Sequence, residues 1–114
     1  GGHPVNCAAA LAVLNKILDE RLVERVATLE TIIREELNVH GVLELRGKGL
    51  LYAAEVGEFD RVLRVIARCL EHGVITDWFL HCNTAIRIAP PLVISEDELR
   101  DGLRILAAAI TAES

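Results

Sequence analysis

One arginine, Arg87, has the surroundings expected of a residue that binds a small anionic molecule. It is the single charged residue in the run Ala85-Ile86-Arg87-Ile88-Ala89, which leads directly into Pro90-Pro91. A planar guanidinium can bind a carboxylate through two parallel N–H bonds, and rigid extended backbone beside it would fix its direction. The alternative is a structural ion pair with a carboxylate of the same chain. The residues alone leave both interpretations open.

A second cationic stretch, Arg46-Gly47-Lys48-Gly49, has the composition of a phosphate-binding loop. Such loops lead from a strand into a helix N-terminus, whereas this stretch joins two predicted strands at 42–46 and 50–56. We therefore expect a hairpin turn over 47–49, whose glycines also permit close backbone approach at a domain boundary. Arg46 and Gly47 are secondary candidates for an active-site or domain-boundary role.

The other polar clusters have simpler structural interpretations. His3 and Cys7 are four residues apart on a predicted helix, but two ligands without a third make no metal site. His81-Cys82 follows the aromatic residues of a predicted apolar loop, where packing explains it. The acidic run Glu96-Asp97-Glu98 belongs to a helix start, where the macrodipole favours negative charge. We predict no metal site.

Composition and charge argue against several function classes. The 114 residues carry a net charge of −5, and the basic residues are scattered among acids, which does not favour nucleic-acid binding. The longest nearly apolar run, 5–14, is too short to cross a bilayer, and no secretory signal is evident. The cysteines, Cys7, Cys69 and Cys82, fit reduced thiols without a disulfide. We expect a cytoplasmic protein that does not associate with membranes.

Helical periodicity accounts for most of the chain. An apolar helix is predicted from Pro4 to residue 14, and amphipathic helices follow at 22–37, at 60–72 and after Ser95. No Pro or Gly separates the first two, so the sequence is compatible with two helices or with one kinked helix. Ser95, with Glu98 three residues later, forms a capping box that marks the start of the last helix.

The segments between these helices predict a small sheet. Strands are expected at 42–46, 50–56 and 84–88; in the last, Ile86 and Ile88 share one face while Arg87 points to the other. The sum is one α+β domain over residues 1–114, with a mainly antiparallel sheet covered by helices on one face. Apolar residues make up 52% of the chain, which predicts a surface that faces a missing partner.

Four stretches, in order along the chain, carry a family resemblance. They are Gly1-Gly2-His3-Pro4 leading into Cys7-Ala8-Ala9-Ala10-Leu11, then Arg46-Gly47-Lys48-Gly49-Leu50, then Ile86-Arg87-Ile88-Ala89-Pro90-Pro91-Leu92, and Ser95-Glu96-Asp97-Glu98-Leu99. Together they resemble the C-terminal small domain of class III aminotransferases. These are pyridoxal-phosphate-dependent transferases of fold type I, and ornithine and acetylornithine aminotransferases are familiar members. The resemblance covers nearly the whole chain.

The resemblance implies a function for a parent enzyme that transfers an amino group between an amino donor and a 2-oxo acid. Arg87 would hold the substrate carboxylate, and Gly1 and Gly2 would lie at the active site or domain boundary of a homodimer. Neither Lys16 nor Lys48 has the context of the lysine that binds pyridoxal 5'-phosphate. The chain alone is therefore expected to be inactive, and to supply substrate contacts and domain closure to a missing large domain.

Two questions stay open at this stage. The stretch Asp77-Trp78-Phe79-Leu80 departs from the ornithine and acetylornithine pattern, and it either narrows the pocket or packs on the other subunit. The amino donor and acceptor are therefore not assigned. A rival interpretation is a stand-alone small-molecule-binding or dimerisation module without catalysis, which the α+β pattern also permits.

Overall fold

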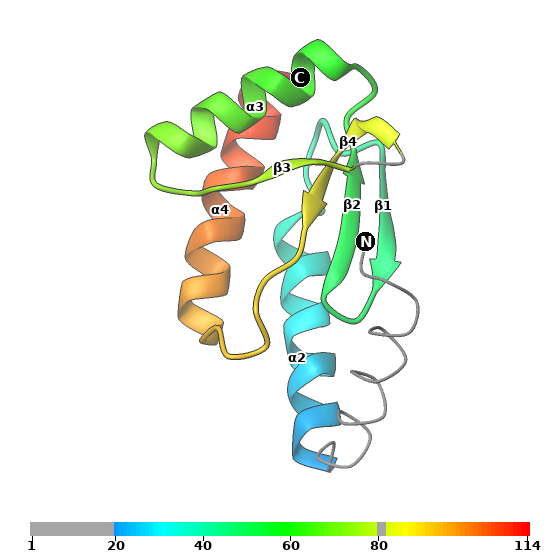
Figure 1. The fold of residues 1–114 in the computed structure, drawn as a ribbon, viewed down its shortest axis with the longest axis vertical. Coiled ribbons are helices and arrows are strands. Elements are labelled where there is room, and N and C mark those ends of the chain that lie inside the picture. The colour runs from blue at the N-terminus through cyan, green and yellow to red at the C-terminus, as the bar shows by residue number, and fades with distance from the viewer. Residues whose placement is uncertain (1–19, 80–81) are drawn as a thin grey trace, which may run out of the picture.

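The computed structural model describes residues 20–79 and 82–114 (Figure 1). The predicted apolar helix from Pro4 to residue 14 and the Gly1–Leu11 stretch lie outside the described residues. The second predicted helix, expected at 22–37, is helical from Glu20. The elements follow in the order α2 (Glu20–Glu36), β1 (Glu44–Lys48), β2 (Leu51–Glu55), α3 (Phe59–Glu71), β3 (Asp77–Phe79), β4 (Cys82–Ile88) and α4 (Glu96–Ala112). This order confirms the predicted α+β class.

The strands form one antiparallel sheet in the spatial order β1-β2-β4-β3. Trp78 and Phe79 were predicted to lie in an apolar loop, and this prediction was wrong because residues 77–79 form the edge strand β3. Trp78 pairs with Ile86 of β4, and its ring meets Phe59 of α3 edge-on, with ring centroids 5.6 Å apart. Aromatic side chains favour a half-buried pleated surface of this kind.

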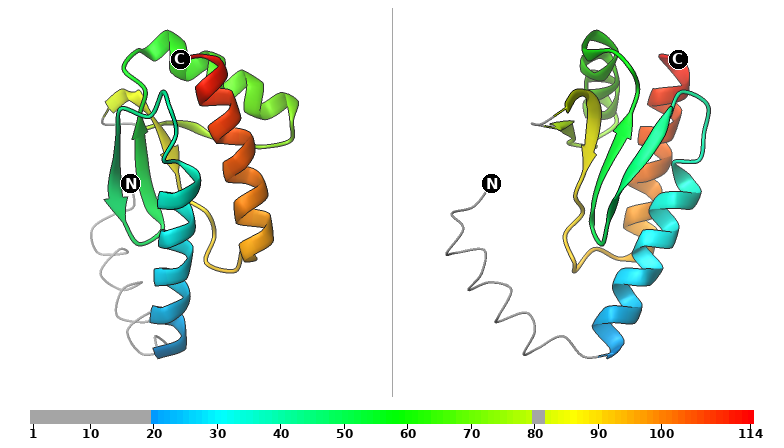
Figure 2. Two further views of the ribbon diagram at one scale, coloured as in Figure 1. Left: turned by 180° about the vertical axis from the view of Figure 1, so that it is seen from behind. Right: turned by 90° about the vertical axis from the view of Figure 1, so that its right-hand side faces the viewer.

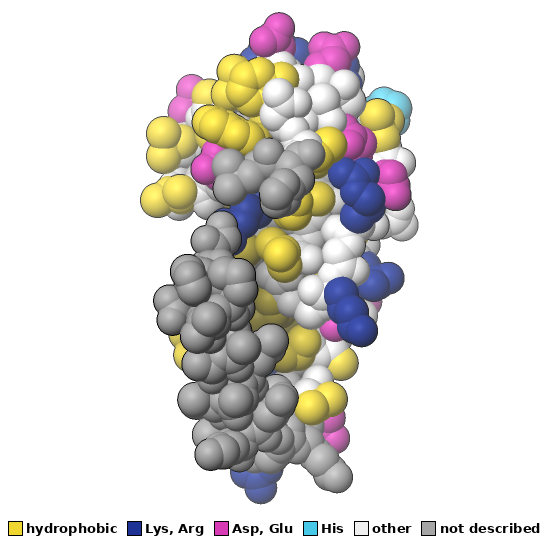
Figure 3. Space-filling view, turned by 45° about the vertical axis from the view of Figure 1, so that its right-hand side comes forward, with side chains coloured by type: hydrophobic (Ala, Val, Ile, Leu, Met, Phe, Trp, Pro, Cys, Tyr) yellow, Lys and Arg dark blue, Asp and Glu magenta, His cyan; other side chains and the backbone are white. Residues whose placement is uncertain are grey.

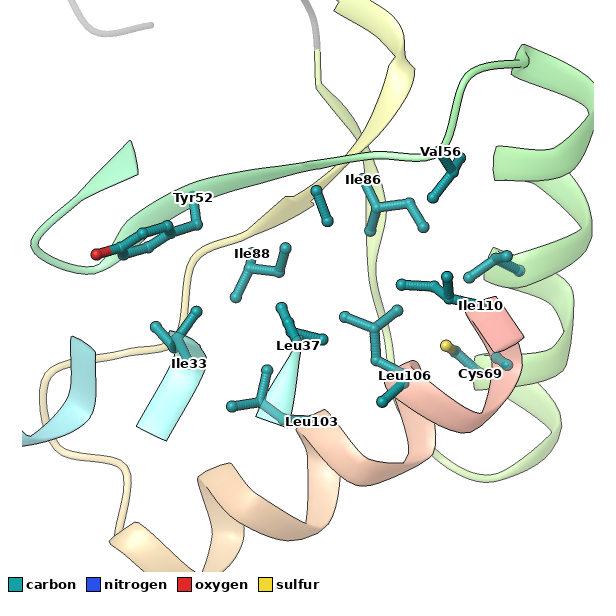
Figure 4. Close-up of a cluster of buried hydrophobic side chains, with 14 of the residues drawn as sticks. Ile33, Leu37, Tyr52, Val56, Cys69, Ile86, Ile88, Leu103, Leu106 and Ile110 are labelled. Atoms are coloured by element: carbon teal, nitrogen blue, oxygen red, sulfur yellow. The ribbon is translucent and has the colours of Figure 1, made fainter. Parts of the chain in front are cut away.

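Helices cover one face of the sheet, as predicted. Figure 2 shows α2 and α4 side by side on one face of the sheet, and α3 contacts β4. The side chains that fill the space between these layers come from every helix and from the two central strands (Figure 4). The largest fully buried ones are Tyr52, Leu29, Ile32, Ile33, Leu37, Ile86, Ile110, Val56, Val62, Val65 and Cys69.

Tyr52 joins the hairpin to α2. Its ring is buried, while its hydroxyl donates to Glu30 Oε2 at 2.7 Å and accepts from Arg34 Nε at 3.2 Å. Burial, together with the hydrogen bond to Glu30, raises the pKa of the phenol above its usual value. The buried ring therefore keeps its only polar atom paired, which is the condition for placing tyrosine in a core.

The β1–β2 hairpin turns one step later than predicted. Lys48 pairs with Leu51, so the loop is Gly49-Leu50, and Gly47 and Lys48 extend β1. Gly49 has φ +65° at the first loop position, where two-residue hairpins of type II′ select glycine. At Gly47, a Cβ would lie 2.3 Å from the Leu51 carbonyl oxygen and 2.6 Å from Tyr52 Cα. Only glycine allows β2 to pass so close.

The helix ends match the sequence signals. The Ser95 hydroxyl accepts from the Glu98 backbone N–H, and the Glu98 carboxylate accepts in return from the Ser95 backbone N–H, which confirms the capping box. At the end of α3, Gly73 has φ +83° and Val74 N–H donates to Cys69 O at 2.8 Å, as in a Schellman motif. None of the helices in the described ranges is both long enough and apolar enough to span a bilayer.

Candidate functional site

Two arginines share one row across the face of the sheet opposite the described helices. Register places Arg46 of β1 opposite Ala53 of β2, Ala53 opposite Arg87 of β4, and Arg87 opposite Asp77 of β3. Residues paired in this way point to the same face of an antiparallel sheet. Because neighbouring strands lie about 4.8 Å apart, the backbones of the two arginines are separated by roughly 10 Å.

Arg87 points away from the helices, as predicted. Its neighbours Ile86 and Ile88 are buried in the core, whereas Arg87 itself is exposed. The strand is held on both sides by β2 and β3, and Thr76 Oγ1 donates to the Arg87 carbonyl at 3.0 Å. The base of the Arg87 side chain is therefore fixed in direction, although the side chain itself reaches solvent.

The guanidinium of Arg87 forms no ion pair or hydrogen bond with any residue in the ranges 20–79 and 82–114. Even Asp77, its cross-strand neighbour, does not pair with it; the Asp77 carboxylate accepts from the backbone N–H of Trp78 at 2.8 Å. The structural ion pair that the sequence left open is thus not formed within the described chain. The five N–H donors of the group are available to an anion.

A hollow of about 240 Å³ opens beside Arg87, between the end of β4 and α4. Its walls are mainly apolar and include Val74, Pro91, Ile94 and Leu103, with Thr76 among the few polar groups. Besides Arg87, the lining includes one charged residue, Glu98. Concave, mainly apolar sites with a few polar groups are typical of small-molecule sites. This arrangement suits a small molecule that carries a carboxylate and a partly apolar body.

Arg46 is bound by its own hairpin. Its guanidinium donates to Glu44 Oε2 at 3.0 Å and to Glu55 Oε1 at 3.3 Å. The hydrogen bond to Glu44 contributes most to raising the pKa of Arg46. Burial raises the pKa of Glu55, but hydrogen bonds from Thr84, the Gly57 N–H, Cys82 and Arg46 outweigh burial and hold it below its usual value. Arg46 is thus engaged in a charge network within the sheet.

A second hollow, of about 540 Å³, lies beside Arg46 on the same face. It is lined by Arg46, Gly47, Lys48, Leu51, Ala53, Phe79 and Cys82. The close approach of β2 explains why position 47 is glycine. A contact with another domain is not required to explain this residue. Lys48 supplies a further cation at the rim of this hollow.

The remaining candidates are dispersed. Gly1, Gly2, His3 and Cys7 lie outside the described residues. Cys82 is the first residue of β4 and not part of a loop, and its Sγ lies 3.2 Å from Thr84 Oγ1 and 3.5 Å from Glu55 Oε1. Within the described ranges no three His, Cys, Asp or Glu side chains are arranged to hold a metal ion.

One contact to the loop after Arg87 was not anticipated from the sequence. Arg25 of α2 donates through Nε to the carbonyl of Leu92 at 3.0 Å and through Nη2 to the carbonyl of Ile94. These partners are 67 and 69 residues away along the chain. An exposed-looking arginine on an amphipathic helix gives no sequence signal for such a contact, because the periodicity places Arg25 on the polar side.

Comparison with known proteins identifies the family. The sequence pattern of the family Aminotransferase class-III matches residues 1–110. The chain belongs to the class III aminotransferases. It is 37% identical to acetylornithine aminotransferase of Corynebacterium efficiens over 111 residues, covering 96% of this chain and 27% of that protein. It is 40% identical to mitochondrial ornithine aminotransferase of Arabidopsis thaliana over 116 residues, covering 93% and 24%.

Solved structures of the family have the same fold. The ornithine aminotransferase of Toxoplasma gondii superposes with a TM-score of 0.65 at 32% identity, covering 96% of this chain and 27% of that one. That structure shows partial occupancy of pyridoxal phosphate at its active site. This chain spans about 27% of the length of the acetylornithine aminotransferase of Corynebacterium efficiens.

The described residues do not fit the role of cofactor anchor. A Schiff base to pyridoxal phosphate needs a lysine inside a pocket, with an acid at the pyridine nitrogen. Lys48 is exposed at the end of β1, and Lys16 lies outside the described residues. Among the described residues, the candidate site is therefore the sheet face around Arg87.

Proposed function

We propose that residues 1–114 are the small domain of a longer, cytoplasmic, homodimeric aminotransferase that uses pyridoxal 5'-phosphate, in which Arg87 binds the carboxylate of the substrate. The parent would transfer an amino group between an amino donor and a 2-oxo acid. The observation that carries the proposal is that the guanidinium of Arg87 has no partner among residues 20–79 and 82–114, on a strand paired on both sides. Gly1, Gly2, Arg46 and Gly47 would lie at the active site or the domain boundary.

The physical role of Arg87 is to orient the substrate. A guanidinium that already had a carboxylate partner would have to exchange it for the substrate, whereas Arg87 has no partner to lose among the described residues. Two parallel N–H···O bonds restrict both the position and the rotation of a bound carboxylate. The apolar walls of the neighbouring hollow exclude water from part of the ligand, which strengthens these charged bonds.

Exposed apolar side chains support a missing large domain. Ile75 is 88% exposed, Val93 87% and Leu43 69%, and all three belong to connecting segments. In the space-filling view of Figure 3, apolar side chains reach the surface at several places on the described part of the molecule. Surfaces of this kind are commonly covered by another domain or subunit. Ile75 and Val93 lie on segments that flank the hollow at Arg87, where domain closure would act.

Substitution of Arg87 in the full-length enzyme tests this proposal. With Arg87→Ala, kcat/KM for amino-acid and oxo-acid substrates is expected to fall by about 100-fold, the value of two charge-assisted hydrogen bonds. The half-reaction of an amine donor that lacks the carboxylate, measured without an oxo acid, should proceed at an unchanged rate. Arg64→Ala is the matched control, because Arg64 pairs with Glu113 on the outside of α3 and α4. Wild-type kcat/KM of Arg87→Ala for every carboxylate substrate would contradict the proposal.

Residues 1–114 alone are expected to have no transaminase activity. Purified residues 1–114 supplied with pyridoxal 5'-phosphate are expected to show no transamination and no absorbance band of an internal Schiff base, because neither Lys16 nor Lys48 has the sequence context of the cofactor-binding lysine. Absorbance spectroscopy with borohydride trapping measures this directly. A trapped adduct on Lys16 or Lys48 would contradict the proposal that the cofactor-binding lysine belongs to the large domain.

A further inference from the structure

The loop that follows Arg87 has few contacts of its own. Residues 89–94 connect β4 to Ser95, the N-cap of α4, and include Pro90 and Pro91, which have no backbone N–H to donate. The loop's one backbone hydrogen bond among the described residues joins Ile94 N–H to Pro91 O at 3.0 Å. A segment with so few internal bonds is fixed only by what it packs against.

Arg25 supplies the polar anchor that the loop lacks. Its Nε and Nη2 donate to the carbonyls of Leu92 and Ile94, so one rigid guanidinium holds two points of the loop. Arg25 itself is partly buried on α2, whose neighbours Leu29, Ile32 and Ile33 are in the core. Bonds from a charged donor are about twice as strong as neutral ones. The loop is therefore tied to the most firmly packed side of the helical layer.

The same loop forms a wall of the hollow at Arg87. Ala89, Pro90, Pro91 and Ile94 line that hollow together with Arg87. Ala89 and Pro90 directly follow Arg87 and Ile88, the last two residues of β4, so a displacement of the loop moves the end of the strand that carries Arg87 and changes the hollow that Arg87 lines. The position of the loop and the direction of Arg87 are thus mechanically linked.

We infer that Arg25 is a positioning residue for carboxylate binding, which acts by holding the 89–94 loop against α2 and so sets the shape of the anion site at Arg87. The inference rests on the proposed function of Arg87. It assigns to α2, which does not contribute a side chain to the hollow, a part in substrate affinity. It also predicts that Arg25 affects binding and leaves the chemical step unchanged.

The test uses the full-length enzyme and glutarate, a carboxylate that has no amino or oxo group to react. Arg25→Met keeps the apolar stem and removes both donors, and Arg25→Lys restores the charge without the planar fork. Arg21→Met is the control, because Arg21 is exposed on the same helix and its side chain has no partner within the described residues. Binding of glutarate is measured by calorimetry, and kcat is measured at saturating substrate.

Arg25→Met should weaken glutarate binding by roughly tenfold, since small displacements at a distance from a site have effects of this size or larger. Arg25→Lys should recover part of the loss, Arg21→Met should lose nothing, and kcat should be unchanged in all three. The amide hydrogens of Leu92, Val93 and Ile94 should exchange faster in Arg25→Met. In an Arg87→Ala background, Arg25→Met should cause no further loss.

The outcomes separate the two proposals. If Arg87→Ala alone leaves glutarate affinity unchanged, the proposed function itself fails. If Arg87→Ala weakens binding but Arg25→Met does not, only the positioning role fails. If Arg25→Met weakens binding equally with and without Arg87, the effect is a general loss of structure, and the positioning role is again overturned.

Discussion

Arg46 and Arg87 occupy equivalent places in one cross-strand row, on either side of Ala53, yet they differ in chemistry. Arg46 lies on the edge strand β1 and is bound by Glu44 and Glu55. Arg87 lies on the central strand β4 and has no side-chain partner in the described ranges. The charge on the edge strand is paired within the sheet, and the charge on the central strand, unpaired among the described residues, is the one that we propose for a ligand. Surroundings, and not residue type, separate the two roles.

Strand register places Arg46 and Arg87 in one row, so a substitution that disrupts the β1–β2 hairpin should lower the stability of the chain most. In Gly47→Ala, the new Cβ would meet the backbone of β2 at 2.3 Å. Backbone cannot move aside as a flexible side chain can, and we expect the free energy of unfolding of the chain to fall by about 3 kcal/mol, measured by urea denaturation.

Gly102→Ala is the control for this prediction. Gly102 lies in α4 with open space where a Cβ would be, so the substitution should stabilise the helix by about 0.5–1 kcal/mol. A Gly47→Ala chain as stable as the wild type would show that the hairpin can shift, and the shared row of arginines would then not be fixed by the sequence.

The two arginines should differ in what they contribute to folding. Arg46→Met is expected to lower the free energy of unfolding by about 0.5–1 kcal/mol, a modest value because the Arg46 side chain is 39% exposed and solvent screens its ion pairs. Arg87→Met should change it by less than about 0.5 kcal/mol. Carboxylate affinity of the full-length enzyme should show the reverse order. If Arg46→Met and Arg87→Met destabilise the chain equally, the two arginines do not differ in their contribution to folding.

The smallest expected effect is on the free energy of unfolding at acidic pH. The pKa of Glu55 is lowered in the folded chain, so its stabilising contribution is present above the unfolded value of about 4.5 and is lost as pH falls through the folded pKa. Glu55→Gln should therefore flatten the loss of stability below about pH 4.5, by about 0.5 kcal/mol over that range. Urea midpoints from pH 7 to pH 3 measure this. An unchanged slope would show that the hydrogen bonds from Thr84, Gly57, Cys82 and Arg46 do not together favour the charged form of Glu55.

The sequence predicted the elements better than their edges. Helices with strong periodicity or capping signals, such as α3 with Gly73 and α4 with Ser95 and Glu98, were located to within a residue or two. The strand β3 was missed because three residues are too few to show an alternating pattern. The shift of the hairpin turn was missed because the contact between Gly47 and β2 depends on pairing across the sheet.

At the candidate site, the local sequence pattern predicted which way Arg87 points, but it did not predict the hydrogen-bond partners of Arg46 and Arg25. The alternation around Arg87 correctly placed it on the face opposite Ile86 and Ile88. The pairing of Arg46 with Glu55, nine residues away, follows from strand register, and the contact of Arg25 with the 89–94 loop follows from the packing of α2. Neither is encoded in the spacing of nearby residues, so neither could be derived before the fold was known.

The two edges of the sheet also bear on how this chain meets other molecules. The outer strand β1 has Glu44, Arg46 and Lys48 along one side, and the opposite edge, β3, has only three residues and a register shift beside Phe79. Charged or very short outer strands discourage a foreign strand from adding to a sheet. The protein is thereby protected against templated aggregation at its borders, and recruitment of a partner is left to side chains and not to main-chain pairing.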